Sequence, residues 1–122
     1  MPAAVLGFAQ LQLALDKVET VPFAWQQVLR NARGIYLLVH RESGQQYVGS
    51  AYGDDGFFGR WKGYSDGHGG NVAMKELTAK AEAFDASILE VMGSDASNEQ
   101  VFDRETLWKK KLGTRVKGLN RN

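Results

Sequence analysis

A carboxylate interrupts the apolar face of a helix predicted near the end of the chain. Val101, Trp108 and Leu112 follow helical spacing, and the position that completes their face is Glu105. A carboxylate on an inward face is costly unless a cation or a hydrogen-bond donor meets it. Glu105 is therefore either half of an ion pair at the edge of the core or a metal-binding, catalytic carboxylate, and the spacing leaves both interpretations open.

Two tyrosines and an arginine raise the same question. Tyr36 and Tyr47 lie on two segments predicted to be neighbouring strands, where paired tyrosines usually serve packing. Arg60 lies in an aromatic cluster, where an arginine often stacks on a ring at the surface. A guanidinium is also permanently charged and forked, so it suits a phosphate group. Packing and phosphate chemistry both remain open for these residues.

Hydrophobic periodicity and turn residues predict the elements that would position these side chains. The predicted elements are strands at 34–40, 45–51 and 84–92, and helices at 57–64, from 71 to 83 and from 98 to 112. Ser97 and Gln100 predict a capping box at the start of the last helix, and Gly113 predicts its end. Residues 116–122 read as irregular. This order predicts an α+β domain with a small, mainly antiparallel three-stranded sheet flanked by helices.

Residues 1–33 precede this arrangement. Their apolar residues first alternate with polar ones and then follow helical spacing. A short extended piece is expected, followed by one or two helices interrupted at Pro22. The chain is therefore divided into an N-terminal helical extension, 1–33, packed on the core, and a domain at 34–122.

The composition is that of a small globular domain. The chain has 122 residues, 43% of them hydrophobic, which suffices for one core. No apolar run approaches the roughly 18 residues of a membrane span, so no membrane partner is expected. Cysteine is absent, which excludes disulfides and fits a reducing compartment, so a cytoplasmic location is expected. His40 and His68 are far apart in the sequence, which argues against zinc.

Positive charge gathers at the C-terminal end, although the net charge is only +1. The last fourteen residues hold six cations and no acidic residue: Lys109, Lys110, Lys111, Arg115, Lys117 and Arg121. Such a run can meet a polyphosphate, or it can be a solvated helix end whose cations suit the helix dipole.

Two tripeptides connect these observations. Gly34-Ile35-Tyr36 and Tyr47-Val48-Gly49 resemble the signature tripeptides of the GIY-YIG nuclease family, with Val48 in place of the central isoleucine. Arg60 stands where the family's arginine is expected, and Tyr64 stands where the family has tyrosine or histidine.

The resemblance extends to the end of the chain. Glu105 matches the metal-binding glutamate of the family's late helix, and Asn120 matches the asparagine near the end of the module. Some repair nucleases of the family carry a lysine where this chain has Ser50. This difference bears on the subfamily more than on the activity. His68 and Asn71 have no general family role. The resemblance covers about residues 34–120.

The resemblance implies hydrolysis of a phosphodiester bond with one divalent cation, Mg²⁺ or Mn²⁺ as a substitute, held by Glu105. One motif tyrosine, Tyr47 in preference to Tyr36, would orient or deprotonate the attacking water. A free phenol has a pKa of about 10, so this tyrosine would need a nearby cation such as Arg60 to lower it. The implied catalytic set is Tyr36, Tyr47, Arg60, Tyr64, Glu105 and Asn120.

The expected partner is DNA, preferred over RNA on family grounds. Lys109, Lys110, Arg115 and Lys117 are expected to contact its phosphates. The sequence contains no recognisable DNA-reading motif, so an attached domain or a partner is expected to supply specificity. The alternative is a catalytically silent module that binds nucleic acid or docks a partner within a larger protein.

Overall fold

The computed structural model describes residues 8–65, 83–93 and 95–120. Its elements, in chain order, are η2 (Phe8–Gln10), β1 (Gln12–Ala14), η3 (Leu15–Thr20), α1 (Phe23–Arg30), β2 (Arg33–His40), β3 (Gln46–Ala51), α2 (Gly56–Ser65), β4 (Phe84–Met92), α4 (Asn98–Leu112) and α5 (Thr114–Lys117). The helix predicted at 71–83 lies almost wholly outside the described residues, as do His68 and Asn71. No helix in the described ranges is long and apolar enough to cross a membrane.

One antiparallel sheet organises the molecule, with strand order β1-β4-β2-β3. The α+β class and the hairpin of β2 and β3 are confirmed, but the predicted count of three strands is wrong. The fourth strand is β1, the extended piece expected in the N-terminal segment, whose Leu13 pairs with Ala86 of β4. A strand of three residues carries too little pattern to reveal its distant partner.

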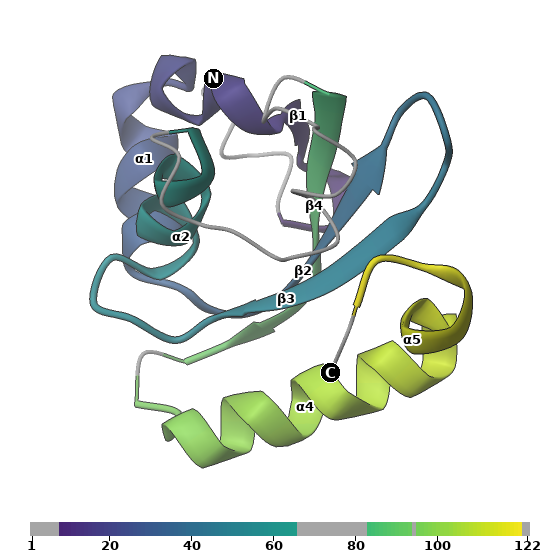
Figure 1. Ribbon diagram of the computed structural model, residues 1–122. Helices are drawn as coiled ribbons and strands as arrows, with labels where there is room; N and C mark the ends of the chain where they lie inside the picture. Colours follow the sequence, from purple (N-terminus) through teal and green to yellow (C-terminus); the bar gives the residue numbers. More distant parts are fainter. Residues whose placement is uncertain (1–7, 66–82, 94, 121–122) are drawn as a thin grey trace.

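Helices cover both faces of this sheet (Figure 1). Alternation along β2 sends Tyr36 and Leu38 into the core formed with α1, α2 and η3, and sends Ile35 to the opposite face. There Ile35 and Val48 pack against Val101 of α4. The N-terminal segment belongs to the first of these cores, because Leu15, Val18, Trp25 and Leu29 are buried in it.

Helix α4 begins and ends as predicted. Ser97 and Gln100 form the capping box, and Gly113 closes the helix in the left-handed conformation at φ +64°. The helix is held against β4 by the carboxylate of Glu90, which accepts hydrogen bonds from Arg104 Nε (2.9 Å) and Trp108 Nε1 (3.0 Å).

The apolar stripe predicted for α4 is only partly correct. Val101 is buried and Trp108 packs beside it, but Leu112 is exposed at the end of the helix. Lys109 takes a buried position instead. The region 116–122 was predicted to be irregular, but residues 114–117 form the short helix α5.

Candidate active site

The site lies along β3, one of the two edge strands of the described sheet, and the C-terminal segment covers part of that edge. Asn120 is buried, and its amide forms two hydrogen bonds of 2.9 Å with the backbone of Val48: Oδ1 accepts from the N–H, and Nδ2 donates to the carbonyl. Leu119 N–H donates to the Gln46 carbonyl. Asn120 thus pairs with the outward-facing backbone groups of Val48, next to Tyr47 on this edge strand.

The glycines of the two tripeptides make room for their neighbours. Gly49 lies opposite Tyr36 in the β2–β3 ladder, and a Cβ there would come within 2.4 Å of the Tyr36 ring. Gly34 adopts φ +152° beside the bulge in the β2–β4 pairing, and a Cβ there would meet the Glu90 carbonyl at 2.0 Å. Both positions therefore require glycine, which explains the tripeptide pattern in steric terms.

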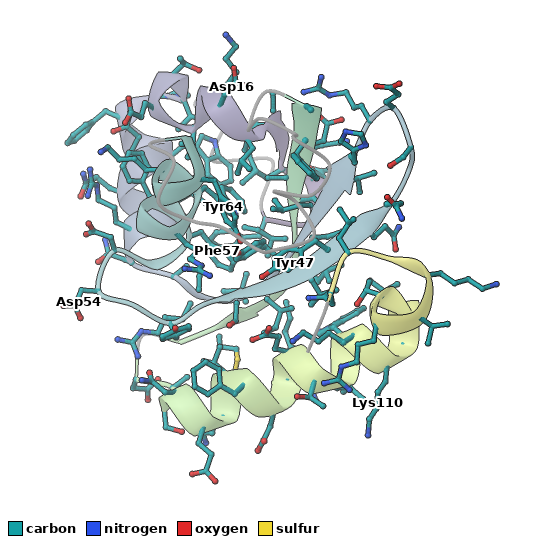
Figure 2. All side chains as sticks on the ribbon, viewed as in Figure 1. Asp16, Tyr47, Asp54, Phe57, Tyr64 and Lys110 are labelled. Atoms are coloured by element: carbon teal, nitrogen blue, oxygen red, sulfur yellow. The ribbon has the colours of Figure 1, made fainter. Side chains whose placement is uncertain are left out.

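Tyr36 lies beneath the site and is fully buried. Its hydroxyl is 2.9 Å from the Tyr64 hydroxyl and accepts a hydrogen bond from Arg60 Nε at 3.3 Å. The Arg60 guanidinium also lies over the Tyr64 ring, 5.6 Å from its centre. Tyr36 of β2 and Tyr64 of α2 thereby fix the direction of an exposed arginine, and Figure 2 shows Tyr47 and Tyr64 in this region between α2 and β3.

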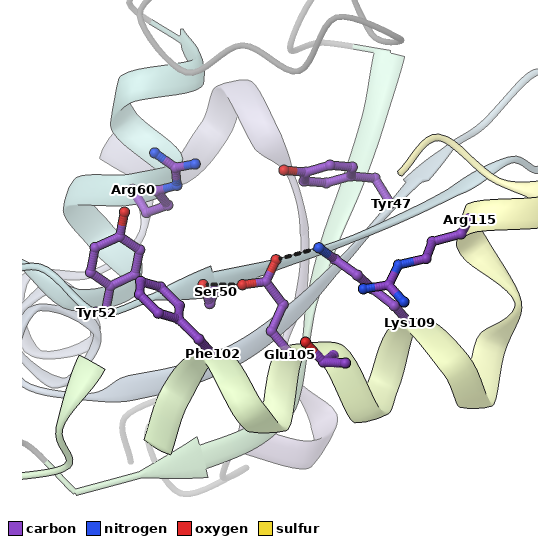
Figure 3. Close-up of a pocket in the computed structure, with 9 residues that line it drawn as sticks. Tyr47, Ser50, Tyr52, Arg60, Phe102, Glu105, Lys109 and Arg115 are labelled. Carbon is purple, nitrogen blue, oxygen red and sulfur yellow. Dashed lines mark hydrogen bonds and ion pairs between the residues drawn. The ribbon is translucent and has the colours of Figure 1, made fainter. Parts of the chain in front are cut away.

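A polar hollow of about 350 Å³ opens between α2, β3 and α4. Tyr47 and Arg60 face it from one side and Glu105 from the other (Figure 3). The complete lining is Tyr47, Ser50, Tyr52, Arg60, Phe102, Glu105, Thr106, Lys109 and Arg115. Three cationic side chains and one carboxylate give this hollow an excess of positive charge, which suits an anionic ligand.

Both oxygens of the Glu105 carboxylate have partners. Ser50 Oγ donates a hydrogen bond to Oε1 at 2.6 Å, and Lys109 Nζ lies 3.0 Å from Oε2. Ser50 and Lys109 are both buried, so the carboxylate is held in one orientation at the wall of the hollow. Of the two interpretations of Glu105, the ion pair is therefore present, and it lies inside the pocket that a ligand would enter.

The phenols of the site are neutral at physiological pH. Burial raises the pKa of Tyr36 above its ordinary value of 10.0, and the opposing effect of Arg60 is smaller. Burial also raises the pKa of Tyr47, and Tyr64 adds to this shift. The pKa of Arg60 is raised by Tyr36, so its guanidinium stays charged. Arg60 was expected to be able to activate a tyrosine, but its effect here does not outweigh burial.

The structure brings most of the predicted site residues together. Tyr47, Arg60, Glu105, Lys109 and Arg115 line the hollow. Tyr36 and Tyr64 lie behind Arg60, and Asn120 lies on the outer edge of β3.

Two predicted phosphate-binding lysines, Lys110 and Lys117, are exposed and do not line the hollow; Figure 2 shows Lys110 on the outer side of α4. Sequence reasoning missed two aromatic residues at the mouth, Tyr52 and Phe102. It noted Ser50 only as a departure from the family pattern, whereas the structure gives it a direct contact with Glu105. The proximity of Ser50 to Glu105 is a tertiary contact between β3 and α4, so no local pattern signals it.

The donor set fits a hydrated magnesium ion better than a transition metal. The described residues contain no group of three or more histidine, cysteine or acidic side chains that could enclose a metal. A single carboxylate facing a polar hollow suits Mg²⁺, which keeps several waters and is often bound through one or two carboxylates and a substrate phosphate. Glu105 would hold the ion, and Lys109 would have to share or release the carboxylate.

Comparison with solved structures gives two matches with the same fold. The catalytic domain of the intron endonuclease I-TevI, in a mutant form, has a TM-score of 0.60 and 25% sequence identity, over 75% of this chain and 94% of that one. Another structure of the catalytic domain of the homing endonuclease I-TevI has a TM-score of 0.57 and 24% identity, over 74% of this chain and 98% of that one. No protein-family model matches the sequence, and no curated protein does.

The positions of the motif residues on the fold agree with the expected resemblance. The two tripeptides lie on paired neighbouring strands, Arg60 follows on α2 and Glu105 on the late helix, in the order that the resemblance predicted. About three quarters of the chain shares the fold of the I-TevI catalytic domain. The expected resemblance to the GIY-YIG type is confirmed at the level of the fold, because the chain is similar to the I-TevI catalytic domain.

Proposed function

We propose that this domain is a divalent-metal-dependent endonuclease that hydrolyses phosphodiester bonds in DNA. The observation that carries the proposal is that Glu105, Arg60 and Tyr47 face one hollow from three different elements. A carboxylate, a fixed guanidinium and a phenol are suited to hold a metal, a phosphate and a water molecule, respectively. The similarity to structures named as intron and homing endonucleases supports this assignment.

The cation cluster would bind the phosphate. Arg60 is exposed at the mouth of the hollow, while its Nε is fixed by the Tyr36 hydroxyl, so its remaining N–H groups can meet phosphate oxygens. Arg115 lines the opposite side of the hollow. Such fixed charges stabilise the growing negative charge on the phosphate oxygens without reorganising during the reaction.

Tyr47 is the motif tyrosine that can meet a water molecule. Tyr36 is fully buried and is engaged with Tyr64 and Arg60, so it positions Arg60 and has no access to the hollow. Tyr47 lines the hollow and, as a neutral phenol, would orient the attacking water by hydrogen bonding. A bound divalent cation would supply charge for the phosphate and for the leaving 3′ oxygen.

A catalytically silent binding module is the second candidate. The observation that favours it is the contact of both Glu105 oxygens with Ser50 and Lys109, as in a structural ion pair. Under either function, the domain by itself would bind mainly through phosphates, and a further domain or partner would supply sequence specificity.

Cleavage of supercoiled plasmid and of a labelled duplex, with Mg²⁺, Mn²⁺ or EDTA, separates the two functions. The proposal predicts metal-dependent nicking by the wild type and a loss of about a hundredfold or more in Arg60→Ala. Arg30→Ala is a matched control, because Arg30 also lies over an aromatic ring, 4.2 Å from the centre of Phe58, but does not line the hollow. If the domain binds DNA but cleaves it with neither Mg²⁺ nor Mn²⁺, the silent module is supported.

A further inference from the structure

Two aromatic rings stand side by side at the mouth of the hollow. Tyr52 follows β3 directly, and Phe102 lies on the first half of α4. Their ring centres are 4.8 Å apart at an angle of 78°, and their exposed fractions are 36% and 42%. Figure 3 shows the pair on the opposite side of Glu105 from Tyr47, with the Tyr52 hydroxyl directed toward Arg60.

The two hydrophobic cores do not account for this pair. Within the part of the chain that the structure describes, neither ring belongs to either hydrophobic core, and both line a hollow whose other walls are mostly polar. Exposed aromatic rings that line a polar hollow offer their faces to a ligand, and nucleobases stack on such rings.

Tyr52 also lines a second hollow. This hollow of about 290 Å³ shares Tyr52 and Arg60 with the first. Three glycines contribute to its wall, Gly53, Gly56 and Gly59, so much of that wall is backbone without side chains. A flat group can approach such a wall closely, and the Tyr52 ring offers it a second face.

The chemistry of the two hollows specifies a nucleotide with a free base. A phosphate bound between Arg60 and Glu105 would place its attached sugar and base within reach of the aromatic rings. Bases stack on exposed aromatic side chains, and stacking is largely independent of sequence because every base has a π-face. A base inside a duplex is already covered on both sides, so only an unpaired or extruded base can use the rings.

We propose that the Tyr52–Phe102 pair is a nucleobase-stacking subsite that selects substrates with an unpaired nucleotide next to the scissile phosphate. The subsite rests on the proposed nuclease function and adds a substrate class to it: flaps, bulges and single-stranded junctions are bound and cut in preference to a continuous duplex. The cationic hollow binds the phosphate, and the aromatic pair distinguishes paired from unpaired DNA.

The test uses two DNA probes of equal length and charge, one a continuous duplex and one with an unpaired bulge containing 2-aminopurine. Affinity and fluorescence quenching are measured in EDTA, and cleavage is measured in Mg²⁺. The wild type is expected to bind the bulged probe about tenfold more tightly and to quench its fluorescence. Tyr52→Ala and Phe102→Ala are each expected to lose most of this preference, while Tyr52→Phe retains it.

The controls separate the subsite from folding and from phosphate binding. Phe23→Ala removes a ring that is 73% exposed on α1 and should change nothing. The salt dependence of binding should stay the same in the Tyr52 and Phe102 variants, because their phosphate contacts remain. Phe102→Ala and Tyr52→Ala change exposed residues on different elements, so a folding defect in one leaves the other informative.

The outcomes distinguish the subsite from the nuclease function. Equal binding and cleavage of both probes by the wild type would overturn the subsite and leave the nuclease function in place. Preferential binding that is lost in Tyr52→Ala, with no cleavage in any metal, would support the subsite and overturn the nuclease function. A preference retained in both Tyr52→Ala and Phe102→Ala would also overturn the subsite.

Discussion

The ammonium of Lys109 lies 3.0 Å from Oε2 of Glu105, one helical turn away on α4. The exposed fractions of the two side chains are only 5% and 16%, so the pair is shielded from water. Ser50 holds the other carboxylate oxygen, which leaves Glu105 little freedom to turn. A cation this close to a carboxylate repels any second cation that approaches it.

Removal of the Lys109 charge should therefore strengthen metal binding. In Lys109→Met, the affinity for Mn²⁺ or Mg²⁺ without DNA is expected to rise by about tenfold, because the repulsion between two cations is lost. Isothermal titration calorimetry measures this change directly. Lys110→Met is the control, since Lys110 is exposed on the same helix and should leave the affinity unchanged. Equal affinities in wild type and Lys109→Met would contradict the role given to Lys109.

The same pair makes a prediction about stability. Glu105→Ala takes the carboxylate away from a buried ammonium and is expected to lower the free energy of unfolding by about 2–3 kcal/mol. Adding Lys109→Met to this variant should recover more than half of the loss, because the buried charge is removed as well. Urea unfolding of the two single variants and the double variant measures this coupling. Destabilisation that simply adds in the double variant would show that the pair is not coupled.

Asn120 should stabilise the edge strand and, through it, Tyr47. Asn120→Ala leaves the buried N–H and carbonyl of Val48 without their partners, which is expected to cost about 2–4 kcal/mol. The Val48 amide should also exchange its hydrogen faster. Asn98→Ala is the matched control, because Asn98 is exposed at the start of α4. An unchanged rate of hydrogen exchange at the Val48 amide in Asn120→Ala would contradict a stabilising role for the hydrogen bonds between Asn120 and Val48.

The buried phenols predict how stability depends on pH. Burial raises the pKa of Tyr36 and of Tyr64 above 10.0, whereas in the unfolded chain both ionise near their ordinary value. Below about pH 10 both states keep these protons, and the stability is fully present. Above it the unfolded chain loses protons that the folded chain retains, so the free energy of unfolding falls as pH rises.

Tyr36→Phe tests this dependence. Removing one buried phenol should make the decline of stability less steep between about pH 10 and about pH 11.5, measured by urea unfolding. Tyr52→Phe removes an exposed phenol and provides the comparison. If stability declines as steeply in Tyr36→Phe as in the wild type, the raised pKa of the buried Tyr36 phenol is contradicted.

Features that depend on local sequence were predictable. The capping box of Ser97 and Gln100 and the end of α4 at Gly113 follow from short patterns with a direct geometric meaning. The hairpin of β2 and β3 follows from its turn and its tripeptides. The sequence also indicated that Glu105 occupies an unusual position, although it could not decide between an ion pair and a pocket carboxylate.

Features that depend on distant contacts were not predictable. Strand β1 owes its place to pairing with β4, more than seventy residues away. Lys109 was expected to contact phosphates as part of a basic run, but its neighbour Glu105 and the packing of α4 on β3 bury it. The contact of Tyr52 with Phe102 joins two elements far apart in the sequence. No local periodicity contains this information.

Replacement of one carboxylate oxygen of Glu105 by an amide tests whether this side chain holds a catalytic cation. Glu105→Gln keeps the size of the side chain and a carbonyl oxygen for Ser50, but it removes the charge that would hold a divalent cation. Glu90→Gln is the matched control, because Glu90 is held by Arg104 and Trp108 and does not line the hollow.

The measurement is the rate of plasmid nicking in Mg²⁺ and Mn²⁺, with correctly folded protein confirmed by thermal unfolding. The account predicts that Glu105→Gln loses about a thousandfold or more of the wild-type rate while still binding DNA, and that Glu90→Gln keeps its rate. Wild-type nicking by Glu105→Gln would contradict the assignment of Glu105 as the metal-binding carboxylate of a nuclease.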